Sequence, residues 1–342
     1  MPLSERRSRI LAFIVEDFVD SASPVGSQTL VERHQLGLSS ATVRNEMALL
    51  EDEGMITHPH TSAGRIPSHR GYRHYVSSLM GERGLSTQEQ FKILHQFHQS
   101  ARELEQWTAL AASVLAQSLG NVALVTQPRL FDVRLKHVQL VELMDNRALL
   151  VAVTADGGVH QHTVEFPVAA HQEQLARIAA RLNADFGGKS VAEFPVREAA
   201  EAPGPVEAVI IAALTQLLLK EQEAGEAPLV EGVREMLRQP EFEHSDRMLD
   251  TLEAVDERHL RDAIPADAVA GGGVAIVIGD ENRVGPYQDM SFVLARYGPQ
   301  SGAGGVLGIL GPTRMAYADA VAHVRYVSDV LTELMSKFYS DE

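Results

Sequence analysis

Hydrophobic residues near the N-terminus recur with the period of an amphipathic helix. Ile10, Ile14 and Phe18 lie on one side of a helix predicted over residues 4–20, and charged residues lie on the other side. Pro24 follows the end of this helix, and Ser27 is a natural cap for a second, short helix over 28–34. The pattern therefore predicts two helices before Gly37.

A third helix is predicted over about 40–52, with Ser39 or Ser40 as its cap. Val43, Met47 and Leu50 lie at i, i+4 and i+7 and face the core. The opposite side carries small and polar residues, namely Ser40, Ala41, Arg44, Asn45 and Ala48. Small residues beside Arg and Asn suit a helix in the DNA major groove, so a helix-turn-helix is predicted, with Arg44 and Asn45 reading bases beside Ser40 and Thr42.

Two short strands follow, over 55–57 and 66–68, joined by a turn-rich segment. Such a hairpin beside a helix-turn-helix is a wing. Thr61, Ser62 and Arg65 supply donors for DNA phosphates, and Arg70 follows them. The pattern alone also permits a protein-binding hairpin.

The charge distribution is compatible with DNA binding by residues 1–80. The 342 residues carry a net charge of −16, yet residues 1–80 hold eight arginines against nine acidic residues, and 57–81 has no acidic residue. Cysteine is absent, which excludes disulfides, thiolate zinc sites and cysteine nucleophiles. The pattern also contains neither a signal-peptide core nor a membrane-spanning run, so a cytoplasmic protein is expected.

The remaining chain alternates between helical and strand patterns. Helices are predicted over 87–119 as a connector, and a long helix over 314–338 closes the chain. The predicted strands are 122–126, 137–143, 148–154, 159–166, 274–278, 291–297 and 306–310, with a helix over 172–186. This order predicts an α+β domain with one antiparallel sheet, interrupted by a helical region over 206–223, 229–238 and 246–264.

Several stretches resemble the HrcA family of bacterial heat-inducible transcription repressors. They are SATVRNEM at 40–47, LEDEG at 50–54, HPHTSAGRIP at 58–67, GYRHYV at 71–76 and GILGPTRMAY at 308–317. The resemblance implies a winged helix at 1–80, a helical connector at 81–119, a GAF-like domain at 120–192 plus 269–342, and an inserted, mainly helical dimerisation domain at 193–268. The resemblance extends over the whole length of the chain, because its motifs lie near both ends.

The resemblance also implies partners and a mechanism. A family member would bind double-stranded DNA as a homodimer at an inverted repeat called CIRCE, ahead of chaperone genes, and would depend on the GroEL chaperonin to stay active. Two alternatives remain open at this stage. One is a transcription factor gated by a small molecule in its GAF-like domain, and the other is a winged helix that docks proteins.

No residue pattern indicates an enzyme, a cofactor or a metal site. The pairs His58-x-His60 and His160-x-His162 lack an obvious third ligand. The segment 280–282 is expected to be a loop between strands. Before the last helix, Thr313 and Arg314 could form an anion site, although a helix cap with a locally paired arginine is the simpler interpretation.

Overall fold

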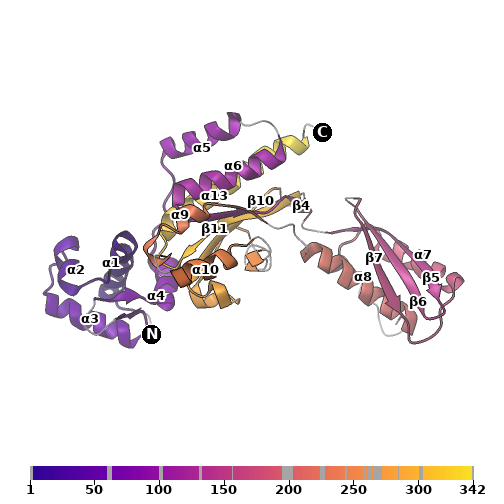
Figure 1. Cartoon of the computed structure of the whole chain (residues 1–342), viewed down its shortest axis with the longest axis horizontal. Helices are drawn as coiled ribbons and strands as arrows, with labels where there is room; N and C mark the ends of the chain where they lie inside the picture. The colour runs from indigo at the N-terminus through magenta and orange to yellow at the C-terminus, as the bar shows by residue number, and fades with distance from the viewer. Residues whose placement is uncertain are drawn as a thin grey trace. The chain divides into compact units, whose positions relative to one another are not determined.

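The chain folds into two compact units (Figure 1). Unit 1 comprises 1–128, 226–300 and 304–342, and unit 2 comprises 129–225 with 301–303. The computed structural model describes residues 3–59, 64–99, 103–130, 133–155, 157–194, 203–223, 228–242, 245–256, 259–260, 263–264, 272–283, 285–299 and 303–340. Among the described helices, none is long and apolar enough to cross a bilayer.

The first part of unit 1, residues 3–80, is a winged helix that we call the head. Its elements are α1 (Glu5–Ser21), α2 (Ser27–His34), α3 (Ser40–Asp52), β1 (Ile56–Thr57), β2 (Ile66–Pro67), α4 (His69–His74) and the π-helical turn η1 (Tyr75–Leu79). Ile14, Leu30, Val43 and Leu50 are fully buried, so the apolar faces of the helices meet in one small core. The head predicted from the hydrophobic pattern is confirmed.

The rest of unit 1, which we call the core, is an antiparallel sheet with helices on both faces. The strands follow the order β8-β3-β11-β10-β9. Their bounds are β3 (Val122–Val125), β8 (Leu229–Glu231), β9 (Val274–Ile278), β10 (Met290–Tyr297) and β11 (Ala303–Pro312). Helices α6 (Leu104–Leu119) and α13 (Tyr317–Ser340) cover one face, and α10 (Ser245–Ala254) lies on the other (Figure 1).

Shorter elements complete the core. They are α5 (Thr87–Gln99), α9 (Val233–Met236), and the 3₁₀ turns η4 (Pro240–Phe242), η5 (Gly279–Glu281) and η6 (Gly285–Tyr287). Because α6 packs against β3 and α13, it belongs to the domain core and is more than the connector that its position suggested.

Unit 2 has its own sheet and its own hydrophobic core. Strands β5 (Leu135–Met144), β6 (Arg147–Thr154) and β7 (Val159–Glu165) pair in that order, all antiparallel. Helices α7 (Gln172–Phe186) and α8 (Pro205–Glu223) pack on the sheet, and Leu135, Leu150, Leu182 and Leu214 are fully buried between the layers. The short strand β4 (Arg129–Leu130) and the turn η2 (Val191–Glu193) belong to the same part of the chain.

Two expectations about the middle of the chain need correction. The single continuous sheet was wrong, because β5, β6 and β7 form a separate sheet with α7 and α8 as its cover. The helix expected over 229–238 was also wrong, because Gly232, at φ +86°, ends a strand before the short α9. Unit 2 therefore spans 129–225 with 301–303, whereas the inserted domain was expected over 193–268. Strand β8 lies at an edge of the core sheet, where it pairs with β3.

Candidate nucleic-acid interface

Helix α3 begins with a capping arrangement built from two of its polar residues. The Ser39 side chain accepts a hydrogen bond from the Thr42 backbone N–H at 3.1 Å, and the two hydroxyls lie 2.9 Å apart. Ser39 is therefore the cap, and Ser40 is the first helical residue. Of the residues expected on the groove face, Ser40 and Thr42 are half-buried, and the Thr42 hydroxyl contributes to the cap.

The exposed side of α3 carries the two base-reading candidates. Arg44 and Asn45 are both exposed, and neither side chain makes a hydrogen bond or ion pair with any residue that the structure describes. Val43 and Met47 are buried behind them, which fixes the rotation of the helix. The donors of Arg44 and Asn45 are therefore available to a ligand.

The wing is tied to the head by backbone pairing. Ile56 pairs with Pro67, and Thr57 pairs with Ile66. Val25 and Arg65 exchange two backbone hydrogen bonds of 2.8 and 2.9 Å, which adds a bridge beside the hairpin. The predicted site residues Thr61 and Ser62 lie outside the described residues.

The side chain of Arg65 has a partner within the head. Its Nη2 lies 2.8 Å from Oε2 of Glu51 in the last turn of α3, and Oε1 of Glu51 contacts Nδ1 of His58. Although burial raises the pKa of Glu51, the hydrogen bond from His58 and the charge of Arg65 lower it below its ordinary value. Glu51 is therefore ionised at neutral pH and neutralises part of the basic wing.

The eight arginines of the head fall into two groups. Five form ion pairs: Arg6 and Arg7 with Glu46, Arg33 with Asp17, Arg65 with Glu51, and Arg73 with Glu281. Three are exposed and without a partner among the described residues: Arg9, Arg44 and Arg70. The sequence pattern predicts Arg44 and Arg70 as site residues but not Arg9 or Glu51, because only the folded chain shows which charges are already paired.

Helix α4 attaches the head to the core within unit 1. Arg73 Nε lies 2.5 Å from Glu281, and its Nη2 donates to the carbonyl oxygen of Ile276 at 2.7 Å. The Asp280 backbone N–H donates to Nδ1 of His69 at 3.2 Å. Residues 280–282, expected to be a plain loop, therefore hold the basic segment that follows the wing.

The motif before α13 is occupied by internal contacts. The Arg314 guanidinium pairs with Glu241 and donates to the carbonyl oxygen of Val19 at 2.6 Å. The Tyr317 hydroxyl donates to the carbonyl oxygen of Thr313 at 2.9 Å. The expected helix cap with a locally paired arginine was wrong, because α13 begins at Tyr317 and the partners of Arg314 lie far away along the chain. Arg314 is nevertheless paired within the protein, which disfavours an anion site.

The hydroxyl of Tyr72, a residue of α4, allows a test of how the head attaches to the core. Tyr72 is 2% exposed, and its hydroxyl oxygen has no hydrogen-bond partner among the described residues. A buried hydroxyl without a partner costs about 1–3 kcal/mol. We therefore expect Tyr72→Phe to increase the free energy of unfolding by about 1 kcal/mol, measured by chemical denaturation.

The matched control is Tyr317→Phe. The Tyr317 hydroxyl lies 2.8 Å from Ser291 Oγ and also donates to Thr313, so its removal is expected to destabilise the protein. A loss of stability in Tyr72→Phe equal to that in Tyr317→Phe would contradict the assignment.

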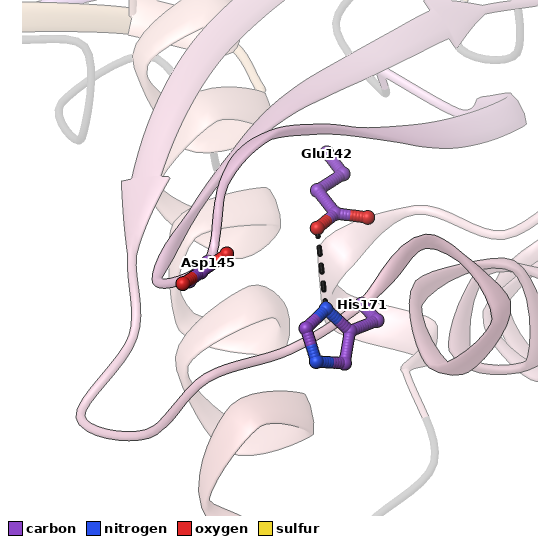
Figure 2. Close-up of side chains that lie close together, drawn as sticks. All are labelled: Glu142, Asp145 and His171. Atoms are coloured by element: carbon purple, nitrogen blue, oxygen red, sulfur yellow. Dashed lines mark hydrogen bonds and ion pairs between the residues drawn. The ribbon is translucent and has the colours of Figure 1, made fainter.

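One group of potential metal ligands lies in unit 2. Figure 2 shows Glu142, Asp145 and His171 together, with Glu142 Oε1 3.3 Å from His171 Nδ1. The other Glu142 oxygen accepts from the Gln172 backbone N–H at 2.6 Å, so this carboxylate satisfies the first turn of α7. Helix capping explains the position of Glu142. Of the histidine pairs noted in the sequence, His160 lies 3.1 Å from Glu221, and His60 is outside the described residues.

Comparison with known proteins decides the family. The family model described as HrcA protein C terminal domain matches residues 105–321. The chain belongs to the HrcA family. A protein of Herpetosiphon aurantiacus named heat-inducible transcription repressor HrcA is 40% identical over 100% of this chain and 98% of its own length.

Further relatives agree with this result. A protein of the same name from Thermomicrobium roseum is 39% identical over 98% of this chain and 96% of its own length. A crystal structure of a hypothetical protein at 2.2 Å resolution shares the fold, with a TM-score of 0.59, 23% identity, and coverage of 98% of this chain and 99% of that one. Like its HrcA relatives, the chain is a heat-inducible transcription repressor and not an enzyme.

Proposed function

We propose that this repressor binds an inverted-repeat CIRCE operator through α3 and the wing. Arg44 and Asn45 read base edges in the major groove, because α3 exposes their side-chain donors and no described residue pairs with them. The remaining site residues contact the DNA backbone or support the groove face: Ser40, Thr42, Thr61, Ser62, Arg65 and Arg70. The exposed Arg44, unpaired within the described part of a head where most arginines form ion pairs, carries this proposal.

We further propose that the repressor acts as a homodimer joined through unit 2. The face of its sheet turned away from the buried core carries Val141 opposite Leu149, and Val153 opposite Val159. Val141 is 38% exposed and Val159 is 59% exposed. An apolar sheet face of this kind suits a second copy, and a two-fold dimer matches the symmetry of an inverted repeat.

A charge on this face should prevent association. Val151 lies between Gln139 and Gln161 in the middle of the sheet, so Val151→Lys places an ammonium in the proposed contact. We expect the variant to sediment as a monomer at concentrations where the parent is a dimer. Val168→Lys, at a 50%-exposed loop position, is the matched control and should remain dimeric. Equal behaviour of the two variants would contradict the proposed interface.

The operator and the chaperonin can be tested together. We place the repressor in the cytoplasm, where the GroEL chaperonin maintains its active form and heat-generated clients withdraw that support. The test is a titration at controlled salt onto a CIRCE duplex and a scrambled duplex, with and without GroEL. A preference of about 10³ or more for CIRCE, increased by GroEL, is the expected result. Equal weak binding by folded protein would overturn it.

A ligand-gated repressor is the second candidate function. A cavity of about 930 Å³ in unit 1 is lined by residues that include Phe18, Tyr72, Tyr287, Met290 and Arg314. This volume is in the range of small-molecule sites. The candidate is favoured if a small molecule raises the thermal unfolding temperature and changes operator affinity together.

A further inference from the structure

A single carboxylate at the end of α3 ties together both sides of the wing. Glu51 directs Oε1 to His58, just after β1, and Oε2 to Arg65, just before β2. The side chains of Glu51 and Arg65 are 24% and 26% exposed, so the contact lies at the surface and is accessible to a ligand. Two basic groups of the wing are thus held by an acidic group of the head itself.

This arrangement places a carboxylate where a phosphate would bind. Carboxylate and phosphate oxygens offer a guanidinium similar acceptors, and both form charge-assisted hydrogen bonds with arginine. Arg65 therefore has to exchange Glu51 for a DNA phosphate when the wing engages the backbone. The exchange reduces the net gain from the phosphate contact, because one ion pair is lost as another forms.

Resting on the proposed DNA contact, we infer that Glu51 is a positioning residue that competes with DNA phosphate for Arg65 and His58. Its role is to lower the affinity of the head for every duplex while leaving base reading by Arg44 and Asn45 unchanged. A repressor that has to release its operator needs such a limit on backbone affinity. Glu51 supplies it from inside the head.

Glu51→Gln separates this competition from simple support of the wing. Glutamine keeps the length and an acceptor oxygen but removes the negative charge. We expect about fivefold to tenfold tighter binding to the CIRCE and scrambled duplexes alike, with the slope of log K against log salt steeper by about one. If the glutamine variant does not fold, Glu51→Asp withdraws the carboxylate by one methylene and should give a smaller gain of the same sign.

Glu53→Gln is the matched control. Glu53 caps the same helix end, but its partner is Arg7 on α1, so the substitution removes one charge without releasing the wing. Its effect on DNA affinity should be clearly smaller than that of Glu51→Gln. In an Arg65→Ala background, Glu51→Gln should lose most of its gain in DNA affinity, because the guanidinium for which Glu51 and phosphate compete is gone.

The outcomes distinguish this inference from the proposed function. If the parent binds CIRCE preferentially but Glu51→Gln binds no more tightly, or matches Glu53→Gln, the competition is disproved and the operator site stands. If the folded parent shows no duplex preference, the proposed operator function itself fails. Weaker binding by Glu51→Gln would show that Glu51 only supports the wing.

Discussion

Arg44→Ala is expected to weaken binding to the CIRCE duplex by about 1–3 kcal/mol, or roughly fivefold to 150-fold. Arg44 is exposed on α3 and its side chain has no partner among the described residues, so its removal is expected to leave the folded head intact and to delete only donors offered to DNA. The loss should be concentrated at one operator base pair and be much smaller on a scrambled duplex. Titration of both duplexes at one salt concentration measures it.

Two further variants define the comparison for Arg44. Arg70→Ala should weaken both duplexes alike and reduce the salt slope by about one, because a backbone contact carries no sequence information. Arg325→Ala removes the same charge from α13 of the core, where Arg325 is exposed, and should leave affinity unchanged. Equal losses of affinity for the two duplexes in Arg44→Ala would contradict the assignment of Arg44 to base reading.

Gly71→Ala is expected to destabilise the head by about 3 kcal/mol or more and to abolish operator binding with it. A Cβ at position 71 would lie 2.0 Å from the carbonyl oxygen of Met55. That oxygen already accepts a hydrogen bond from the Ser68 backbone N–H at 3.1 Å, so it cannot simply move aside. Helix α4 would have to separate from the chain that leads into β1.

The control for Gly71 is Gly81→Ala, because a Cβ at position 81 meets no atom of the described residues within 4 Å. It should bind the operator and unfold like the parent. Thermal unfolding followed by circular dichroism, together with the titration above, measures both variants. A Gly71→Ala protein with unchanged unfolding temperature would show that α4 packs less tightly against Met55 than the structure indicates.

Local pattern was enough to predict the head and the groove face of α3. The spacing of Val43, Met47 and Leu50 fixes which side of the helix is buried, so the exposure of Arg44 and Asn45 follows from periodicity. The ion pairs that the arginines form could not be predicted from the sequence. Arg73 and Glu281 are 208 positions apart, and no local rule connects them.

The division of the strands between two sheets left a signal in the sequence that the prediction did not use. Strands β5 and β6 alternate between buried and more exposed positions, whereas β3, β10 and β11 of the core are buried at nearly every position, as expected for a sheet covered on both faces. The partner depends on which helices cover the sheet, and α8 was assigned to another domain. The short β8 was missed because Gly232 reverses the chain only three residues after Leu229.

The pairing of β3 with β8 has a consequence for how the chain folds. Val125 lies opposite Leu229, so residues 129–225, which make up all of unit 2 except 301–303, lie between two neighbouring strands. Closing a flexible loop of on the order of 100 residues costs roughly 4 kcal/mol of chain entropy. A unit 2 that has already folded shortens this effective loop, and the edge of the core sheet then forms quickly. Folding of the inserted unit should therefore precede completion of the core sheet on the kinetic pathway.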